Sequence, residues 1–270
     1  MSKEITLAIV DTYNGKKFPK LAIEKTIEKI RCKKILYFSD SPLNEGESFY
    51  KINKIKSLGD YSEFVLHCIP HFIETDKLLI IQWDGFAVKQ ELWNDDFLLW
   101  DYIGAPWLNL DPKNNVGNGG FSIRTTKLMD AVKNIPIHTS LYLSDGHAED
   151  ALISRHYGTK LEEYGIRFAP AEIAINFSSE NPSVIGKSFG FHGAYNFPFY
   201  LPENILIEHH DELLERINKP PSIGLLLFNA TKANYHDLIK TCQQHLHNKN
   251  PEKLNEIANL FKNNNLNILQ

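Results

Sequence analysis

The chain has few of the features that mark several common protein classes. It contains only 3 cysteines, and Cys32, Cys68 and Cys242 are scattered without CxxC spacing, so neither a cysteine-based zinc site nor a disulfide framework is predicted. No apolar run approaches the roughly 20 residues that span a bilayer. The formal net charge of −4 gives no electrostatic reason to expect nucleic acid as a partner.

Two common nucleotide-binding motifs are also missing. The sequence contains neither the GxGxxG fingerprint nor a glycine loop followed by Lys and Ser or Thr, so these patterns predict no dinucleotide or ATP site. The first residues lead straight into a strand-like segment and not into a secretory signal. We therefore expect a cytoplasmic protein, with a membrane surface as a second location.

What is present is typical of a globular α/β protein. Hydrophobic residues make up 43% and charged residues 23% of the 270 residues, which is enough for one large domain with an appendage. Residues 5–10 and 34–40 are strand-like and end in acids, and residues 21–30 between them have helical periodicity. Strand, helix and strand in this order predict a parallel sheet.

The apolar stretch at 78–81 is the centre of the sequence pattern. It predicts a buried strand over 78–84 that delivers Asp84 to its carboxyl end, where α/β sheets bind ligands. A carboxylate there could hold a hard divalent cation and, through it, phosphates. The alternative is that Asp84 only caps the following turn.

The rest of the chain alternates helical and strand-like segments. We expect a helix at 61–72, a glycine-rich segment leading into a strand at 117–124, a loop or lid at 136–146 and a helix at 148–157 that Gly158 stops. A short strand is predicted at 166–170, continuing through 171–176. The pattern predicts one catalytic domain over 1–204 and a helical extension over 205–270.

Three groups of residues could carry chemistry, and each has a structural alternative. Gly117, Asn118, Gly119 and Gly120 could place backbone against a sugar or phosphate, or form a tight turn. Glu149 and Asp150 point about 100° apart on a helix, so one could be a general base, although acids are common in first turns.

His192, between glycines, could reach a metal or phosphate, or be structural. Histidines such as His209 and His210 lack HxH or HExxH spacing, and we interpret them as solvated or core residues.

Taken in order, these segments resemble one known family. The blocks are IQWD (81–84), DFLLWDYIGAPW (96–107), VGNGGFSIR (116–124), ED (149–150), FSSE (177–180) and FGFHG (189–193). Together they are similar to the DUF5672 family, over about residues 5–200, and that family in turn looks like the GT-A glycosyltransferases. The resemblance implies a Rossmann-like α/β/α domain that binds a nucleotide sugar, commonly with Mn²⁺ or Mg²⁺.

The resemblance also assigns roles to residues. Gln82, Trp83 and Asp84 take the place of the DxD metal motif, and Gln82 departs from it by replacing the first acid. Glu149 and Asp150 match the xED motif, which implies Asp150 as catalytic base, and His192 completes the metal site with Asp84. The resemblance further implies that residues 117–120 lie beside donor and acceptor, and that three residues contact the nucleotide base, namely Asp11, Thr12 and Tyr13.

The implied activity is transfer of a sugar, hexosyltransferase in type, from a UDP-sugar to a glycan or other hydroxyl acceptor with inversion. The context that the resemblance suggests is cytoplasmic synthesis of a surface polysaccharide. The C-terminal tail lies outside the resemblance; its Leu and Ile residues at helical intervals predict a helical tail that packs on the domain or serves oligomerisation or peripheral association. One alternative is a carbohydrate- or nucleotide-sugar-binding protein without activity. A sugar-nucleotide pyrophosphorylase is less consistent, because residues 11–17 lack its glycine-rich loop with Arg and Lys.

Overall fold

The structure is a computed structural model that describes residues 4–43, 49–107, 115–134, 148–180 and 186–263. The contacts within the chain divide it into two units, residues 1–192 and 193–270. The expected loop or lid at 136–146 lies outside the described residues.

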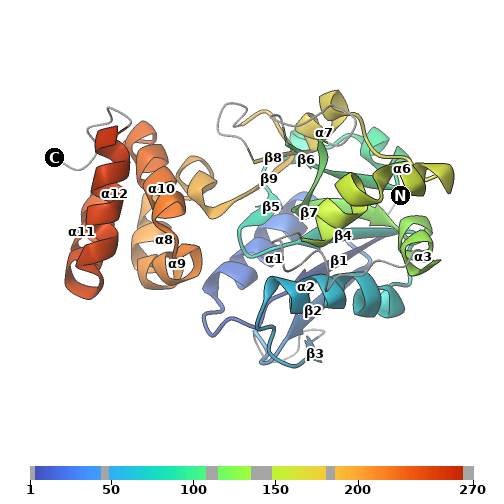
Figure 1. The fold of residues 1–270 in the computed structure, drawn as a ribbon, viewed down its shortest axis with the longest axis horizontal. Coiled ribbons are helices and arrows are strands. Elements are labelled where there is room, and N and C mark those ends of the chain that lie inside the picture. The colour runs from blue at the N-terminus through green and yellow to red at the C-terminus, as the bar shows by residue number, and fades with distance from the viewer. Residues whose placement is uncertain (1–3, 44–48, 108–114, 135–147, 181–185, 264–270) are drawn as a thin grey trace. The chain divides into compact units, whose positions relative to one another are not determined.

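The first unit is built on a six-stranded mixed sheet (Figure 1). Its strand order is β3-β2-β1-β4-β7-β6; the first four strands run parallel, and β7 is antiparallel to both of its neighbours. The bounds are β1 (Ile5–Val10), β2 (Lys34–Ser39), β3 (Phe49–Lys51), β4 (Lys77–Ile81), β6 (Tyr102–Pro106) and β7 (Val116–Thr125). The prediction of an α/β fold with a mostly parallel sheet is confirmed.

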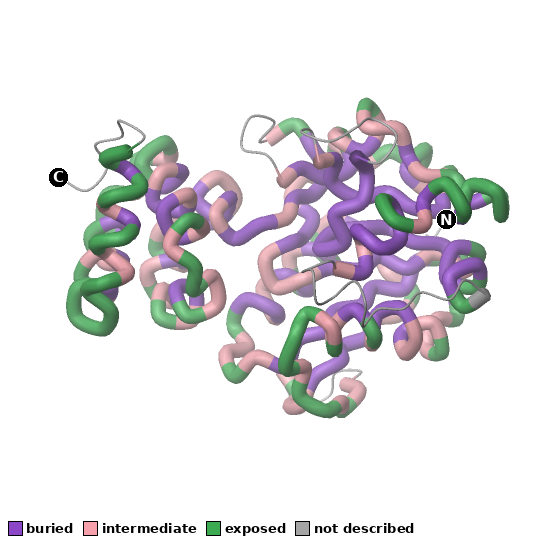
Figure 2. The backbone as a smooth tube through the Cα atoms, in the orientation of Figure 1, coloured by how far each residue is buried: buried purple, intermediate pink, exposed green. Residues whose placement is uncertain are grey.

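Both faces of the central strands are buried, which explains their continuous apolar runs (Figure 2). Right-handed crossovers from β1 to β2 and from β3 to β4 run in opposite directions, so their helices cover opposite faces. On one face, residues of β1, β2 and β4 pack with Val65, Ile69 and Met129 of the covering helices. Helix α1 (Lys17–Lys29) belongs to the first crossover and α2 (Leu58–Glu63) to the second.

A second, three-stranded sheet lies beyond the end of β4. Its strands are β5 (Gly85–Ala87), β9 (Gly190–His192) and β8 (Ser178–Ser179), with β5 antiparallel and β8 parallel to β9. The pairing of β5 with β9 sets Gly85 opposite His192. The small sheet therefore brings the end of this unit back to the turn that follows β4.

The remaining helices of the first unit bear on two predictions. Residues 171–176 belong to helix α7 (Ala171–Phe177) and not to a strand, because Pro170 suits a helix start and the following Ala and Glu favour helix. The helix predicted at 148–157 is present as α5 (Glu149–Ala151) and a π-helical turn that ends at His156, and Gly158 also begins the next helix, α6 (Gly158–Glu163). A further helix is α3 (Thr126–Asn134).

Two further predictions concern the site. The strand predicted over 78–84 ends at Ile81, and residues 82–85 form a tight turn closed by the Gly85 N–H donating to the Gln82 carbonyl at 3.1 Å. Residues 117–120 do not form a turn or loop; they lie within β7, where they pair with β6 and extend past the end of β4.

The described part of the second unit is helical. Its α-helices are α8 (Glu203–Glu208), α9 (His210–Ile217), α10 (Pro220–Lys232), α11 (His236–Lys249) and α12 (Pro251–Asn263). The unit begins before the predicted boundary at 204/205, because the 3₁₀ turn at 194–199 packs on α10, with Asn229 Nδ2 donating to the Tyr195 carbonyl at 2.8 Å. None of the helices within the described residues is both long enough and apolar enough to cross a membrane.

Candidate active site

His192 lies at the centre of a polar cluster at the end of β4. Its Nε2 atom is 3.1 Å from Gln82 Oε1 and 3.5 Å from Asp84 Oδ1. Its Nδ1 atom is 3.2 Å from Glu180 Oε1. Burial alone would lower the pKa of His192, but the Asp84 and Glu180 carboxylates outweigh it and hold this pKa well above the ordinary value.

Neighbouring side chains fix the orientation of these groups. Gln82 Nε2 donates to the Tyr61 hydroxyl at 2.8 Å, which turns the Gln82 amide oxygen toward His192. Asn118 Nδ2 donates to Glu180 Oε2 at 3.0 Å, and Asn118 Oδ1 accepts from the Gly120 N–H at 3.0 Å. The structure thus connects β7 to Glu180 and His192 through one hydrogen-bonded chain.

The adjacent acids Glu149 and Asp150 have different environments. Glu149 is 2% exposed and accepts from Arg124 NH2 at 2.6 Å, while its backbone N–H donates to Ser62 Oγ at 3.1 Å. Glu149 is therefore a buried structural anion.

The other acid, Asp150, has a pKa that is shifted toward neutrality. Its Oδ2 atom accepts from the Gly119 N–H at 2.7 Å and its Oδ1 atom from the Ala151 N–H at 2.7 Å. Burial, together with the charge of Glu149, raises the pKa of Asp150 to about 7, against the lowering effect of these bonds and of Arg124. A carboxylate with a pKa near neutrality suits a general base.

The glycines of β7 leave the space that Asp150 and His192 occupy beside the strand. A Cβ atom added at Gly119 would lie 3.1 Å from Asp150 Cβ and 2.8 Å from Arg124 NH2. One added at Gly120 would overlap the His192 ring. Because successive strand residues face opposite sides, Asp150 borders one face of this glycine pair and His192 the other.

Two neighbouring residues of helix α2 bond to Gln82 and to Glu149. Tyr61 receives the Gln82 amide, and the neighbouring Ser62 receives the Glu149 backbone N–H. Burial raises the pKa of Tyr61, and the charges of Glu149 and Asp150 add to this effect. The Tyr61 hydroxyl therefore stays protonated at physiological pH. The site is held together by residues of α2 and β7 and by the turn that follows β4.

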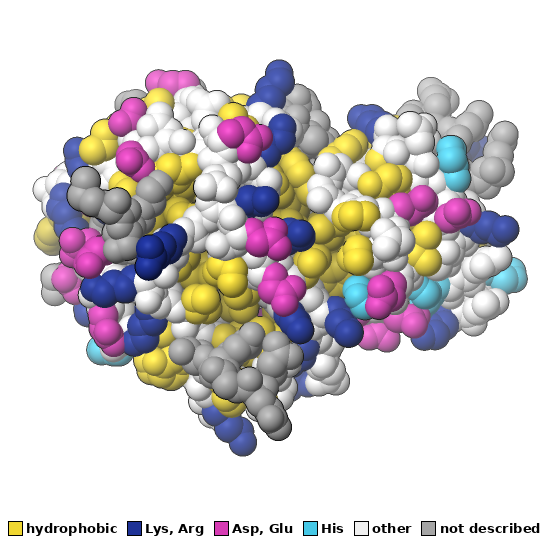
Figure 3. Space-filling model, turned by 180° about the vertical axis from the view of Figure 1, so that it is seen from behind, with side chains coloured by type: hydrophobic (Ala, Val, Ile, Leu, Met, Phe, Trp, Pro, Cys, Tyr) yellow, Lys and Arg dark blue, Asp and Glu magenta, His cyan; other side chains and the backbone are white. Residues whose placement is uncertain are grey.

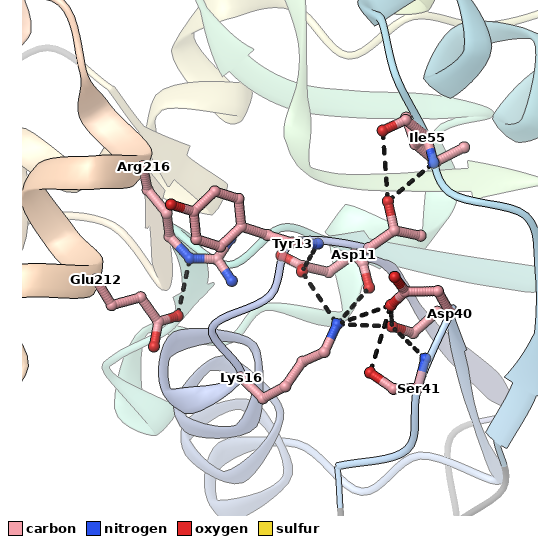
Figure 4. A network of polar contacts seen from close by, with 10 residues as sticks. Asp11, Tyr13, Lys16, Asp40, Ser41, Ile55, Glu212 and Arg216 are labelled. Carbon is pink, nitrogen blue, oxygen red and sulfur yellow. Dashed lines mark hydrogen bonds and ion pairs between the residues drawn. The ribbon is translucent and has the colours of Figure 1, made fainter.

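The predicted nucleotide contacts lie at the end of β1, beside β4. Thr12 Oγ1 accepts from the Ile55 N–H at 2.9 Å, and Asp11 Oδ1 accepts from the Tyr13 N–H at 3.0 Å (Figure 4). Lys16 lies among them, with Nζ 2.9 Å from Ser39 Oγ and 3.3 Å from Asp40 Oδ1. The backbone at this edge is therefore anchored by internal hydrogen bonds.

A cavity of about 1240 Å³ opens next to this edge. Residues 51–56 and part of α2 line it, including Ile55, which bonds to Thr12. Lys54 and Lys56 lie in its wall. Its lining does not include Asp84, Asp150 or His192, so the hollow and the polar cluster are separate parts of the surface.

The predicted residues thus fall into three places. Gln82, Asp84 and His192 come together; Asp150 with 117–120 forms a second group; residues 11–13 form the third. Trp83 packs its ring against Phe18 of α1, at 5.9 Å between centroids.

Sequence reasoning gave no role to Glu180, Tyr61, Arg124 or Lys16. A buried arginine in an apolar strand was the one available signal, since it requires an anionic partner.

Comparison with known proteins identifies a family. No curated protein matches the chain. A solved structure described as "Crystal structure of a glycosyltransferase involved in the glycosylation of the major capsid of PBCV-1" is similar at a TM-score of 0.46 and 10% identity, covering 70% of this chain and 92% of that chain. Residues 47–192, more than half of the chain, match the family described as "Protein of unknown function (DUF5672)", and the chain therefore belongs to the DUF5672 family.

Proposed function

We propose that this protein is an inverting glycosyltransferase that uses a nucleotide sugar, with UDP as the nucleotide, and a divalent cation. The observation that carries the proposal is the position of Asp150, which has a pKa of about 7 and borders Gly119, next to the Gly120 that borders the His192 ring. A base and a cation site beside adjacent residues of one strand are the two groups that a single displacement needs.

The first demand is removal of a proton from the acceptor. The Asp150 carboxylate takes the proton of the acceptor hydroxyl as its oxygen attacks the anomeric carbon, and the nucleoside diphosphate leaves from the opposite side. One displacement inverts the configuration. The Gly119 N–H holds the Asp150 carboxylate in place during this step, at 2.7 Å.

The second demand is neutralisation of the leaving diphosphate. Gln82 Oε1, Asp84 Oδ1 and His192 Nε2 offer an amide oxygen, a carboxylate and an imidazole, a donor set that suits Mn²⁺ and, with less nitrogen preference, Mg²⁺. Gln82 Oε1 and Asp84 Oδ1 lie 3.1 and 3.5 Å from His192 Nε2, so these three side chains would hold one cation together. Glu180 on Nδ1 is the carboxylate that commonly supports a metal-bound histidine.

The donor end of the site supports the nucleotide assignment. The end of β1, with Asp11, Thr12 and Tyr13, lies beside β4, and Thr12 Oγ1 accepts from the N–H of Ile55 in the wall of the neighbouring cavity. In this proposal the nucleoside lies at residues 11–13, and the sugar lies toward Gly119 and Gly120.

Replacement of Asp150 by Asn tests the base. Loss of the proton acceptor is expected to lower sugar transfer by 10²–10⁴-fold, while the Asn carbonyl still accepts from Gly119. In wild type, kcat/KM should rise with pH through about 7. The control is Glu163→Gln, an exposed acid on α6. Near-normal transfer by a folded Asp150→Asn protein would refute the role.

Removal of metal tests the cation. Transfer and donor hydrolysis should stop in EDTA and return with Mn²⁺, and Asp84→Asn should raise the Mn²⁺ concentration needed. Calorimetry with UDP-, GDP- and CMP-sugars identifies the donor. Full activity in EDTA would refute the metal requirement and would mean that the protonated His192 ring neutralises the charge of the leaving diphosphate.

A second function is favoured by one observation. Gln82 stands where the DxD metal motif has its first acid, so one fewer carboxylate is offered to a cation, and Asp84 and Glu180 already form ion pairs with His192. A protein that binds nucleotide sugars without transfer would show calorimetric binding but no turnover with any acceptor, and Asp150→Asn would leave binding unchanged.

A further inference from the structure

Three side chains of the second unit converge between α9 and α11. His245 Nδ1 lies 2.8 Å from Asp211 Oδ1, and His210 Nε2 lies 3.6 Å from the same oxygen. Each residue offers one ligand atom, and the three atoms all lie within 4.8 Å of one another. Figure 3 shows histidine side chains beside acidic ones on this unit.

The orientation of His210 suits a metal ligand. Its Nδ1 atom lies 2.7 Å from the Ile207 carbonyl oxygen, which can only accept, so Nδ1 carries a proton and donates it. In the neutral ring Nε2 then carries the lone pair, and it faces Asp211. A backbone carbonyl on the other ring nitrogen is the usual support of a metal-bound histidine.

His245 approaches from the neighbouring helix. Its side chain is 9% exposed, and its ring meets the His210 ring edge-on, with centroids 5.3 Å apart. Two packed imidazoles and one carboxylate from two different helices form a preorganised set. In ligand type and number they match a zinc site with three protein ligands.

We propose that His210, Asp211 and His245 bind one Zn²⁺, with the fourth position open to water. Zinc bonds of 2.0–2.2 Å in a tetrahedron put neighbouring ligand atoms about 3.4 Å apart. The two distances to Asp211 Oδ1, 2.8 and 3.6 Å, lie on either side of this value, and all three ligand atoms lie within 4.8 Å of one another. His245 keeps its ring neutral by carrying its proton on Nε2.

Lys249 is the group that zinc would displace. Its Nζ atom lies 3.5 Å from Asp211 Oδ1, but the side chain is 63% exposed and can turn into solvent. A bound ion would join α9 to α11. It would therefore stabilise the second unit, independently of the proposed sugar transfer.

Calorimetric titration of the full-length, tag-free chain with ZnCl₂ tests the site. All variants carry Asp84→Asn, so that zinc binding at the His192 cluster is reduced. We expect one ion per chain, with His245→Ala and Asp211→Asn each lowering zinc affinity by at least ~10-fold. Asp211 is 63% exposed, so its variant is expected to fold even if His245→Ala does not.

The matched control is His247→Ala, an exposed histidine on the same helix. It should leave zinc affinity unchanged. Unchanged affinity in Asp211→Asn, or an equal loss in His247→Ala, would overturn the proposal. Neither result bears on Asp150 or His192, which lie in the first unit.

Discussion

Glu149 and Asp150 show how two neighbouring acids acquire different roles. The Glu149 carboxylate is fixed against the fully buried Arg124, whereas Asp150 reaches only backbone N–H groups. A buried ion pair is costly to break, because removal of one charge leaves the other without its partner in a medium of low polarity. The two positions therefore respond differently to substitution.

Glu149→Gln is expected to reduce stability much more than activity per folded molecule. Loss of the charge opposite Arg124 should lower the free energy of unfolding by about 3–5 kcal/mol. Urea unfolding measures the change, with the exposed Glu163→Gln as control. A Glu149→Gln protein with wild-type stability would show that the ion pair does not hold α5 to β7.

Asp150 gives a pH-dependent contribution to stability. The folded protein holds this proton up to about pH 7, whereas the unfolded chain releases it near pH 4. Between these values the folded state binds more protons, so this group makes the unfolding free energy fall as pH rises. In urea unfolding, the stability of Asp150→Asn relative to wild type should therefore be greater at pH 8 than at pH 5. The same difference in unfolding free energy at the two pH values would contradict the raised pKa.

The sequence pointed to Asp84, Asp150 and His192 through their order along the chain; it placed Glu180 at the end of the FSSE block but gave it no role. The Glu180 carboxylate reaches His192 only because β8 pairs with β9, and nothing local to residues 177–180 specifies that pairing. The same limit applies to His210 and His245. They come from separate helices, so no ligand spacing exists along the chain.

At the scale of elements, β7 is a strand whose glycine-rich first half has a low intrinsic preference for strand structure. Three glycines in five residues favour a turn, yet residues 116–125 form a strand. Their conformation depends on groups far away in sequence, because Ser154, Glu149 and His192 occupy the space of the missing side chains. The parallel strands β1, β2 and β4 were predictable since their apolar runs alone indicate burial, whereas the short, half-exposed β3 was not predicted.

Gly120→Ala tests this dependence. The added Cβ would overlap the His192 ring, so we expect a loss of about 1–3 kcal/mol of stability from overpacking and weaker Mn²⁺ binding. The matched control is Gly224→Ala in α10, where the nearest atoms would be 3.8 Å away and alanine favours the helix by about 0.5–1 kcal/mol. Unchanged Mn²⁺ affinity in Gly120→Ala would show that His192 is not a ligand of the metal.

At the scale of the whole molecule, each unit has its own apolar interior. Leu79 lies in the sheet of the first unit, and Leu227 lies among the helices of the second; both are 0% exposed. The sequence predicted a helical C-terminal part because its character changes after about 202. The boundary itself was harder to predict, because the turn at 194–199 has no strong helical pattern but packs with α10.

Leu227→Ala should weaken the second unit alone. Truncation of a fully buried leucine costs about 2–5 kcal/mol, so amide exchange should speed up in α8–α12 and stay unchanged in β1 and β4. Leu79→Ala should give the reverse pattern. If either variant accelerates exchange equally along the whole chain, the two units unfold as one.

The missing side chains at 117, 119 and 120 also determine how relatives with the same chemistry can be recognised. A search based on acids would accept any chain with a carboxylate near 84 and a pair near 150. A relative with a larger residue at 120 would nevertheless have no room for the imidazole, however many acids it kept. The glycine positions are therefore a stricter criterion than the charged ones for extending this assignment to newly sequenced members.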